Sequence, residues 1–303
     1  MSSVSVVIPT FNREKYILST LDSVAGQTVL PDMVVVVDDG STDNSLAIIN
    51  HWVARHPDLK IEVIRTDNRG ASAARNLGLE TIRAEHEYVA FLDSDDIWPP
   101  DFLERTLSSL SNQPDAVAVS TDREFIFPAD NTRSFSSLAD ITANPWQWLL
   151  LKDAGIGSCT LLRTTAVVTA GGYPVEQATG HDVILFGRIA LTGTWLHAPG
   201  QPTQFTRFDP KHHSKVEHHT FQRYTDHLYR WACAATQLWN EAPPFVRKDS
   251  ASRKALANRW YKAAGQLRKI GEVQKARLAF KRAHTLHPLK TKYLKARILS
   301  KFW

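Results

Sequence analysis

Three carboxylates stand close together at the end of one apolar run of the sequence. Asp93, Asp95 and Asp96 follow Tyr88–Leu92 (YVAFL), with Ser94 between the first two. Carboxylates held this close repel one another unless a cation compensates them. Hard divalent ions such as Mg²⁺ and Mn²⁺ favour carboxylate oxygens and commonly share substrate phosphates as ligands. The spacing therefore indicates a metal–diphosphate site, although acids that cap a helix and form a turn would give the same pattern.

Two further segments carry polar groups of the kind that hold a nucleotide. Val34–Asp43 (VVVVDDGSTD) places Asp38 and Asp39 at the end of another apolar run, where either could accept a hydrogen bond from a base imide or a ribose hydroxyl. Asp-Gly-Ser is also ordinary turn chemistry. Asp67–Gly78 (DNRGASAARNLG) places Arg75 at the start of a helix, where an arginine and backbone amides suit a nucleotide diphosphate. Taken alone, Arg75 fits an exposed surface helix at least as well.

These clusters need a scaffold that brings them together, and the hydrophobic pattern of the first third of the chain predicts one. Runs typical of buried strands alternate with segments of helical periodicity, and the joining loops are short. Such alternation indicates a mostly parallel sheet covered by helices on both faces, in which ligands bind beyond the carboxyl ends of the strands. We expect strands at Val4–Ile8, Met33–Val37, Lys60–Arg65 and Tyr88–Leu92, and helices at Asn12–Val24 (with Asn12 as N-cap), Asn44–Ala54 and Ala71–Arg83.

The pattern becomes less regular after the acidic cluster. We expect helices at Pro100–Leu110 and His181–Thr192, strands at Ala116–Ser120 and Ser158–Leu162, and an irregular stretch around Trp146 and Trp148. Arg207–Val216 is a polar, His-rich loop, and every periodic segment after it is helical. We therefore place a domain boundary near residue 215, with residues 1–215 as an α/β domain and residues 216–303 as a small all-α region.

Together these segments resemble glycosyltransferase family 2, from Val4 to about Ser214. The resemblance rests on VSVVIPTFNREKYILSTLDSVAGQT at Val4–Thr28, VVVVDDGSTD at Val34–Asp43, NRGASAARNLGL at Asn68–Leu79 and YVAFLDSDDIWPPDFL at Tyr88–Leu103. Their order and spacing make it specific, although no single piece is. It implies the GT-A fold, a Rossmann-like, mostly parallel sheet flanked by helices, and an inverting transfer from a nucleotide-sugar donor.

The resemblance also assigns residues to the donor site. Thr10 and Asp39 fall where the family holds the base and ribose, and Arg75 falls where it steadies the donor. Asp93-Ser94-Asp95 matches the family's Asp-x-Asp, in which Asp95 is the expected ligand of Mn²⁺ or Mg²⁺ and Asp93 lies nearer the ribose or a metal-bound water. The full set expected at the donor is Pro9, Thr10, Asn12, Asp38, Asp39, Arg75, Asp93 and Ser94, with Asp95 and Asp93 at the metal.

The acceptor side is implied by Thr179–Arg188 (TGHDVILFGR), which looks like the family's Glu-Asp pair followed by Leu and Arg. Asp182 takes the position of the general base, and a carboxylate that opens a helix is stabilised in its ionised form. His181 stands where the family usually has Glu, so what that Glu does for base orientation or acceptor choice is open. The residues expected around the acceptor or in a lid are His181, Trp146, Arg188, His212 and His213, although clustered exposed histidines are more often plain surface.

The chemistry expected of these groups is that of a hexosyltransferase-type glycosyltransferase (EC 2.4). A divalent ion neutralises the charge that develops on the diphosphate leaving group. A carboxylate on the opposite face of the sugar takes the proton of the attacking hydroxyl, which gives inversion. UDP-sugar is the default donor, with dTDP and GDP left open, and the expected acceptor is a glycan or a lipid-linked hydroxyl in bacterial cell-envelope polysaccharide assembly. The sequence identifies neither the sugar nor the acceptor, nor the oligomeric state.

Charge is divided unevenly along the 303 residues. The net charge is +5, but Arg247–Lys301 holds 17 Lys and Arg against two acids, which leaves −10 on the preceding residues. A basic tail on an acidic body suggests an anionic surface as partner, either a membrane or nucleic acid, unless the tail is simply a solvated helical face. No recognised nucleic-acid-binding module accompanies the charge, so nucleic acid is not expected.

The tail itself divides into two parts. Residues 257–288 resemble one tetratricopeptide unit, with small residues for close helix packing and Gly271 at the turn. Leu289–Trp303 (LKTKYLKARILSKFW) is short, basic and amphipathic, which suits the surface of an anionic membrane or packing against the repeat. No apolar run approaches the roughly 20 residues of a membrane span, no signal peptide is indicated, and the two cysteines, Cys159 and Cys233, lack metal-type spacing. We expect a cytoplasmic protein, peripheral on the inner face of the cytoplasmic membrane.

Two other functions are compatible with parts of the pattern. A sugar nucleotidyltransferase would share the sheet and the acidic site, but it would normally carry a Gly-rich basic loop after the first strand, where this chain has Pro9-Thr10-Phe11-Asn12. A catalytically silent scaffold could bind partners through the helical tail. The joint presence of Asp93, Asp95, Asp182 and Arg75 argues against a silent scaffold.

Overall fold

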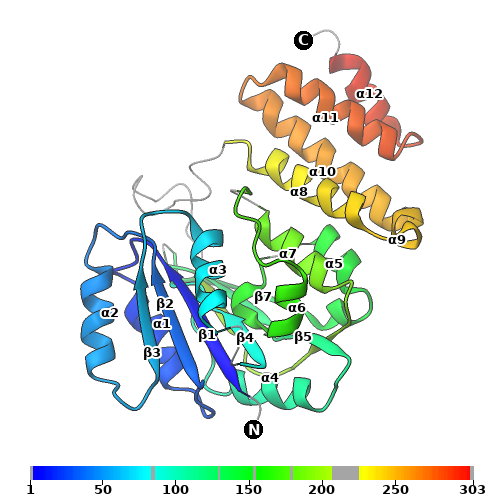
Figure 1. The fold of residues 1–303 in the computed structure, drawn as a ribbon. Coiled ribbons are helices and arrows are strands. Elements are labelled where there is room, and N and C mark those ends of the chain that lie inside the picture. Colours follow the sequence, from blue (N-terminus) through cyan, green and yellow to red (C-terminus); the bar gives the residue numbers. More distant parts are fainter. Residues whose placement is uncertain are drawn as a thin grey trace.

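A seven-stranded sheet forms the centre of the N-terminal region, which we define as residues 3–206 (Figure 1). The computed structural model describes residues 3–82, 86–128, 130–152, 155–177, 180–206 and 225–300. Within the sheet the strand order is β3-β2-β1-β4-β8-β5-β9, and only β8 runs antiparallel to its neighbours. The strands are β1 (Val4–Thr10), β2 (Met33–Asp38), β3 (Ile61–Arg65), β4 (Tyr88–Phe91), β5 (Ala116–Ser120), β8 (Thr160–Arg163) and β9 (Thr194–His197). The predicted mostly parallel α/β sheet is therefore confirmed.

Helices cover both faces of this sheet, which explains why its central strands are apolar throughout. Val6 and Val34 point to the face covered by α1, α2 and α4, and Val7 and Val35 point to the face covered by α3 and α7. A parallel strand buried on both faces is read as a continuous apolar run rather than an alternating one. The helices of the N-terminal region are α1 (Ile17–Ala25), α2 (Ser45–Ala54), α3 (Ala71–Ile82), α4 (Phe102–Ser111), α5 (Pro145–Leu151), α6 (Thr164–Thr169) and α7 (His181–Ile189), with short 3₁₀ turns at Ala139–Thr142 and Gly157–Cys159.

The first helix begins later than the sequence suggested. The predicted N-cap, Asn12, has a left-handed backbone with φ of +52°, and the helix starts at Ile17. Asparagine tolerates this conformation better than most residues. Its side-chain Oδ1 accepts a hydrogen bond from the Thr42 amide at 2.8 Å. Asn12 therefore joins the loops after β1 and β2 instead of capping α1.

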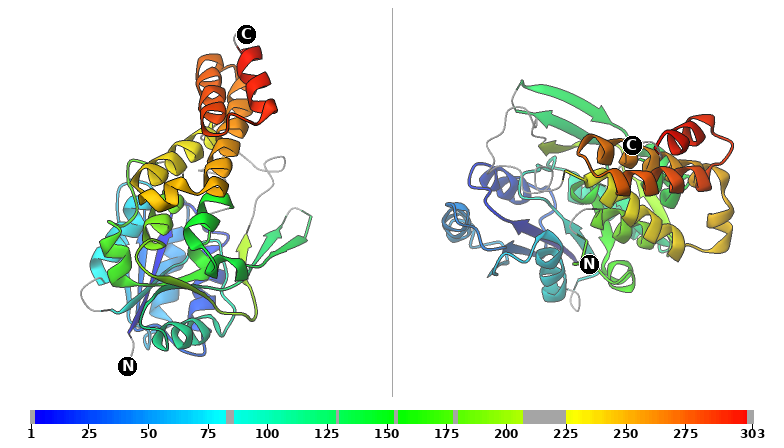
Figure 2. Two further views of the ribbon diagram at one scale, coloured as in Figure 1. Left: turned by 90° about the vertical axis from the view of Figure 1, so that its right-hand side faces the viewer. Right: turned by 90° about the horizontal axis from the view of Figure 1, so that it is seen from above.

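A second, three-stranded sheet was not predicted. It has the order β10-β6-β7, with β6 (Arg123–Phe127), β7 (Thr132–Ser136) and β10 (Thr203–Thr206), and the β6–β7 hairpin projects from the body (Figure 2). Its strands are short and β7 is largely exposed, so they lack the apolar run that identifies a buried strand. The irregular stretch expected around Trp146 and Trp148 also contains α5.

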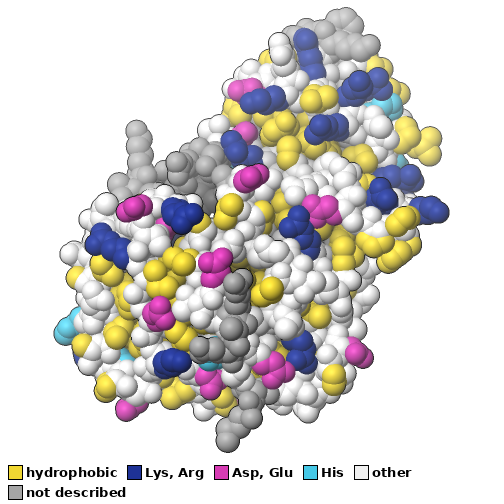
Figure 3. All heavy atoms as spheres, viewed as in Figure 1, with side chains coloured by type: hydrophobic (Ala, Val, Ile, Leu, Met, Phe, Trp, Pro, Cys, Tyr) yellow, Lys and Arg dark blue, Asp and Glu magenta, His cyan; other side chains and the backbone are white. Residues whose placement is uncertain are grey.

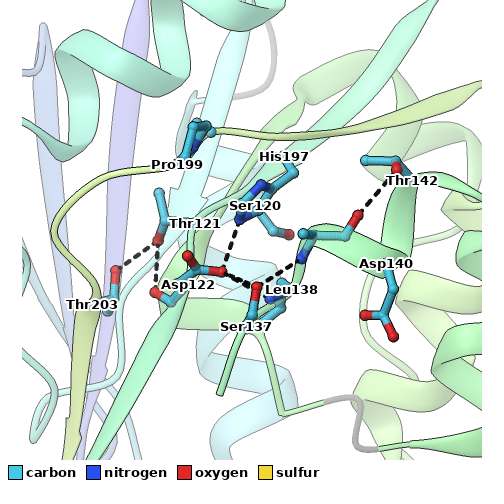
Figure 4. A network of polar contacts seen from close by, with 12 residues as sticks. Ser120, Thr121, Asp122, Ser137, Leu138, Asp140, Thr142, His197, Pro199 and Thr203 are labelled. Atoms are coloured by element: carbon cyan, nitrogen blue, oxygen red, sulfur yellow. Dashed lines mark hydrogen bonds and ion pairs between the residues drawn. The ribbon is translucent and has the colours of Figure 1, made fainter. Parts of the chain in front are cut away.

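A polar network joins the two sheets (Figure 4). The Asp122 carboxylate, between β5 and β6, accepts hydrogen bonds from the Ser137 hydroxyl and the Leu138 amide, both at 2.9 Å, and lies 2.8 Å from His197 Nε2 of β9. Thr121 Oγ1 lies 3.1 Å from Thr203 Oγ1 of β10. These contacts fix the second sheet against the edge of the first.

All regular elements described from residue 225 onward are helices, as predicted. We define residues 225–300 as the C-terminal region. Its helices are α8 (His227–Glu241), α9 (Pro244–Lys248), α10 (Ser250–Lys269), α11 (Val273–Leu286) and α12 (Thr291–Leu299). The α10–α11 turn contains Gly271 at φ +81°, and Trp260, Ala263 and Ala283 are buried between the helices. In the described part of the chain, no helix combines the length and apolar character needed to cross a bilayer.

The two regions share one continuous hydrophobic core, because α8 packs on both α7 and α10. A side chain at Gly187 of α7 would collide with Leu238 of α8, so the two helices approach closely. Asp249 caps α10 by accepting from the Ser252 amide at 2.7 Å and also accepts from Gln147 of α5 at 3.0 Å. The boundary expected near residue 215 lies outside the described residues.

Candidate active site

The polar clusters meet at the carboxyl-end edge of the sheet. β1 ends at Pro9 and Thr10, β2 ends at Asp38, and Asp93 follows β4 by two residues. In the order β3-β2-β1-β4, the strands β2 and β3 lie on one side of β1, and the later strand β4 lies on its other side. Such a switch in strand order opens the crevice in which α/β sheets bind ligands.

Asp39 fixes the loop that leads to α3. Its Oδ1 accepts hydrogen bonds from Thr66 Oγ1 and the Arg69 amide, both at 2.8 Å, and its Oδ2 accepts from the Gly70 amide at 2.7 Å. An ionised carboxylate has about four acceptor positions, so three of those of Asp39 are used inside the protein. The sequence predicted a nucleotide contact for Asp39 but gave no indication of this positioning role.

The neighbouring residues at the ends of β1 and β2, Thr10 and Asp38, are also buried. Asp38 is fully buried, accepts from the Ser41 amide at 3.2 Å and lies 3.6 Å from Arg65 Nε. Thr10 is buried beside it, and its hydroxyl has no hydrogen-bond partner among the described residues. Asp38 Oδ2 likewise has no hydrogen-bond partner within the described ranges, so both buried groups keep an unused hydrogen-bonding atom at the ends of their strands.

The repulsion expected within the acidic cluster is relieved by three separate sets of partners. Arg75 Nη2 donates to Asp93 Oδ1 at 2.5 Å, and Arg13 Nε donates to Asp95 Oδ2 at 3.1 Å. The fully buried Asp96 accepts from the Ser158 hydroxyl at 2.6 Å and from the Thr206 amide at 3.0 Å. Asp96 is therefore an internal anchor, whereas Asp93 and Asp95 keep 42% and 16% of their side chains exposed at the edge.

Arg75 is buried against an aromatic ring that the sequence did not single out. Its guanidinium carbon lies 5.0 Å from the ring centre of Tyr173, whose backbone is held by the Asn76 side chain at 2.7 and 2.8 Å. Burial lowers the pKa of Arg75, but the nearby carboxylates of Asp93 and Asp182 outweigh it and raise the pKa. Burial raises the pKa of the Tyr173 hydroxyl, which stays neutral.

Four buried polar atoms on this arginine and on two nearby side chains have no hydrogen-bond partner in the described ranges. They are Nε and Nη1 of Arg75, the hydroxyl of Tyr173 and Nδ1 of His181. Buried polar atoms are normally hydrogen-bonded, so a group of orphans in one place calls for an explanation such as a ligand. Gly171 and Gly172, both with positive φ, precede Tyr173 and are the sequence signal that could have drawn attention to it.

Asp182 enters this cluster from the first turn of α7. Gly180 precedes the helix at φ +82°, and a side chain there would collide with Ala234 of α8. Asp182 Oδ1 lies 3.6 Å from His181 Nε2, and its side chain is 28% exposed. Burial lowers the pKa of His181, so its imidazole is neutral near pH 7. The base position is thus a partly exposed carboxylate beside a neutral imidazole and a buried arginine.

The other predicted acceptor residues are not brought to this cluster. Arg188 binds both oxygens of Glu241 in α8 at 2.8 and 2.9 Å, and it lies about 9 Å along α7 from Asp182, six residues at about 1.5 Å each. Trp146 is buried, with its ring centre 6.0 Å from that of Trp239, and this contact joins α5 to α8. His212 and His213 lie outside the described residues.

The carboxylates of Asp93 and Asp95 have the chemistry to hold a divalent cation. Both offer hard oxygen donors from one short turn at the sheet edge. Over the described ranges, no group of three or more His, Cys, Asp or Glu is placed to bind a metal. A two-carboxylate site fits Mg²⁺ or Mn²⁺, which complete their ligand shells with water and substrate phosphates.

Comparison with known sequences identifies a family. The pattern of Glycosyl transferase family 2 matches residues 5–168, more than half of the chain. A putative teichuronic acid biosynthesis glycosyltransferase of Bacillus subtilis, TuaG, is 43% identical over 105 residues, which cover 34% of this chain and 40% of TuaG. The chain spans less than half of the length of the curated relatives that it matches.

Solved structures show the same fold. TarS of S. aureus in complex with UDP-GlcNAc has a TM-score of 0.67 at 20% identity, covering 97% of this chain and 89% of TarS. The mannosyltransferase PcManGT from Pyrobaculum calidifontis, in complex with GDP-Man and Mn²⁺, has a TM-score of 0.59 at 23% identity, covering 99% and 87%. At these identities the likeness establishes the fold of the chain and nothing finer.

Proposed function

The chain belongs to glycosyl transferase family 2, and we propose that it transfers a sugar from a nucleoside-diphosphate sugar to a hydroxyl of a glycan or lipid-linked acceptor, with inversion. The observation that carries the proposal is the convergence of three elements. The acidic turn after β4, the buried Arg75 of α3 and Asp182 of α7 meet at one edge of the sheet, where four buried polar atoms of Arg75, Tyr173 and His181 have no partner in the described ranges.

The donor would be bound by the acidic turn and Arg75. A divalent cation held by Asp95 and Asp93 would neutralise negative charge on the diphosphate leaving group. Arg75 keeps two N–H-bearing nitrogens without a partner among the described residues, and they can donate to diphosphate oxygens. UDP-sugar is the proposed donor class; the UDP-GlcNAc complex of TarS supports it, and the GDP-Man complex of PcManGT keeps GDP as the alternative.

Asp182 would be the general base. As the acceptor oxygen attacks the anomeric carbon, the bond to the diphosphate breaks and the acceptor proton passes to the Asp182 carboxylate. The positive end of α7 favours the ionised form of this side chain before reaction. The neutral His181 adds no like charge beside the base, in contrast to the Glu usual in the family.

The name of TuaG supports a place for this reaction in the assembly of bacterial cell-envelope polysaccharide. A lipid-linked acceptor for such assembly would be met at the inner face of the cytoplasmic membrane. That location is part of the proposal, and the surface that would serve it is considered below.

The test is to incubate the full chain with UDP-, GDP- and dTDP-sugars, a panel of glycan and lipid-linked acceptors, and Mn²⁺ or Mg²⁺. Release of nucleoside diphosphate would be followed over time, and the anomeric configuration of the product would be read by NMR. We expect release with one nucleotide class, dependence on the metal, and inverted configuration. Retained configuration would contradict the base assignment, and absence of release from every donor would contradict the proposed activity.

A further inference from the structure

The last described helix, α12, is attached to the protein by one side only. Tyr293 is buried, with its ring centre 5.0 Å from that of Tyr261 in α10. Arg277 Nε of α11 donates to the Ser300 carbonyl at 2.6 Å, just beyond the end of α12. These contacts fix which face of α12 points inward and therefore which face points away.

The outward side of α12 and of the turn before it carries four exposed aliphatic side chains. Leu289 is 89% exposed and Leu299 is 58% exposed, and Leu294 and Ile298, which are four residues apart and share one helix face, are also exposed. Single exposed leucines are ordinary on protein surfaces. Four large aliphatic side chains within eleven residues form a concentration that marks an interaction site.

Cations surround these apolar side chains. Lys290 and Lys295 are exposed in the same segment, the ammonium of Lys292 lies 4.8 Å from the ring centre of Tyr261, and no acid occurs between Glu272 and Ser300. Figure 3 shows Lys and Arg side chains spread over the C-terminal region with hydrophobic side chains between them. A helix that offers aliphatic side chains flanked by lysines suits the interface of an anionic bilayer. The cations could also bind the phosphates of a nucleic acid, but such binding would not account for the exposed leucines.

The position of this surface agrees with a bilayer on the side of the candidate active site. The C-terminal region rises beyond the edge at which β1 and β2 end, and the N-terminus lies at the opposite end of the molecule (Figure 1). A membrane held at α12 would therefore lie on the same side as the acidic turn. The inference that a membrane at α12 brings a lipid-linked acceptor to the acidic turn rests on the proposed function. The binding of α12 to the membrane does not.

We propose that the outward face of α12 and of the turn before it, formed by Leu289, Leu294, Ile298 and Leu299 with Lys290 and Lys295, docks the protein peripherally on an anionic phospholipid bilayer. The leucine and isoleucine side chains enter the headgroup boundary, and the lysines meet the lipid phosphates. Sequence alone left this segment open between membrane binding and packing on the repeat. In the structure, one face of α12 packs on the protein through Tyr293, and the aliphatic side chains of the other face are exposed and free to bind a membrane.

The first test measures flotation of the full chain with vesicles, without donor or acceptor. Vesicles of phosphatidylcholine alone are compared with vesicles in which about one-quarter of the lipid is phosphatidylglycerol. The variant Leu289→Ser/Leu294→Ser/Ile298→Ser/Leu299→Ser is compared with Leu18→Ser/Val29→Ser/Leu30→Ser/Leu191→Ser, which removes four exposed aliphatic side chains from the N-terminal region. We expect binding only to anionic vesicles, a fall of about tenfold or more for the first variant, and less than about twofold for the second. Equal effects of the two variants would overturn the proposal.

A second pair of variants separates this face from general basicity. Lys290→Gln/Lys295→Gln removes the two outward lysines of α12 and its preceding turn, and Lys269→Gln/Lys281→Gln removes two exposed lysines from α10 and α11. We expect the first double variant to weaken vesicle binding by about tenfold more than the second. Equal weakening would show attraction by net charge alone and would overturn the assignment to α12.

Binding to nucleic acid and turnover of a soluble acceptor are two further measurements. The first distinguishes a nucleic acid from a membrane as partner, and the second distinguishes the docking inference from the proposed activity. Retention of the chain by duplex or single-stranded nucleic acid together with no flotation on anionic vesicles would also overturn the membrane assignment. Turnover of a soluble acceptor is measured in parallel on the same variants. Loss of flotation with full turnover would refute only the inference on docking, whereas flotation without any turnover would refute only the proposed activity.

Discussion

The N-terminal and C-terminal regions differ in whether they bury charged side chains. The N-terminal region buries Asp38, Asp39, Arg75, Asp96 and Asp122 among others. In the C-terminal region, every described Lys, Arg, Asp and Glu is at least partly exposed, and the buried polar residues there are serines. Its interior consists largely of alanine and aromatic side chains, which allow helices to approach closely.

This difference agrees with the proposal that the N-terminal region carries out the reaction and that the C-terminal region binds an external surface. A buried charge is costly unless it is paired and hydrogen-bonded. The N-terminal region meets much of that cost with specific partners, such as Arg75 for Asp93 and Ser158 for Asp96, and four of its unpartnered buried atoms lie on Arg75, Tyr173 and His181. The C-terminal region avoids the cost and places its cations where an external anion can reach them. The following predictions test this division, from the largest expected effect to the smallest.

The largest effect is expected from Asp182→Asn. Without a carboxylate to take the acceptor proton, kcat should fall about 10²–10⁴-fold, the usual contribution of a general base. Donor affinity should stay close to that of the wild type, because Asp182 is placed on the acceptor side. Initial rates and equilibrium donor binding measure the two quantities, with the exposed Asp58→Asn as the matched control. Unchanged turnover would remove Asp182 from the base position.

The junction between the regions is the next target. Leu238→Ala in α8 removes a fully buried side chain that packs against Gly187 of α7. We expect the free energy of unfolding to fall by about 2–5 kcal/mol, as for other buried leucines. The half-exposed Leu278→Ala should change it by less than about 0.5 kcal/mol. Denaturant titration measures both. Equal, small effects would mean that α8 does not stabilise the helix that carries Asp182.

Much of the N-terminal fold could be predicted, because β1, β2 and β4 are buried on both faces and their apolar runs do not depend on distant partners. β6, β7 and β10 could not, since short strands with exposed polar residues are stabilised by their neighbours in space. Among site residues, Asp93, Asp95 and Asp182 stand in recognisable motifs.

Other contacts of the site depend on the tertiary fold alone. Arg13 binds Asp95, which lies 82 positions later in the sequence. Tyr173, in the segment between α6 and α7, packs against Arg75 of α3. The loop-fixing role of Asp39 was missed for the same reason: its hydrogen-bond partners begin 27 positions later.

Tyr173→Phe tests whether the orphaned groups serve a ligand. Because the Tyr173 hydroxyl is buried without a partner among the described residues, its removal should raise the free energy of unfolding by about 1 kcal/mol. The same change should lower kcat/KM, since a destabilising group at a functional site is kept for its activity. Thermal unfolding and steady-state kinetics are the measurements. A variant that is both less stable and fully active would contradict this interpretation.

The smallest expected effect is the loss of folding stability at low pH that follows protonation of the Asp122 carboxylate. Burial raises the pKa of this carboxyl, but hydrogen bonds from Leu138, His197 and Ser137 outweigh it and lower the pKa. A lowered pKa gives stability that is present above the ordinary carboxyl pKa of about 3.9 and is lost as pH falls through the lowered value.

The stability difference between wild type and Asp122→Asn should therefore be constant near neutral pH and shrink below about pH 4. Urea titrations at several pH values measure it. A difference that stays constant down to pH 3 would contradict the assignment, and Asp58→Asn should show no such trend.

The most direct test of the central claim, that the acidic edge binds a nucleoside diphosphate together with a metal, is thermal unfolding of the full chain with UDP, GDP, dTDP and CMP, each with and without Mn²⁺. We predict that one nucleoside diphosphate stabilises the wild type only when Mn²⁺ is present, by about 2.7 kcal/mol at a concentration of a hundred times Kd. Asp95→Asn should lose the part of this gain that requires the metal. No stabilisation by any pair, or an unchanged response in Asp95→Asn, would contradict the account.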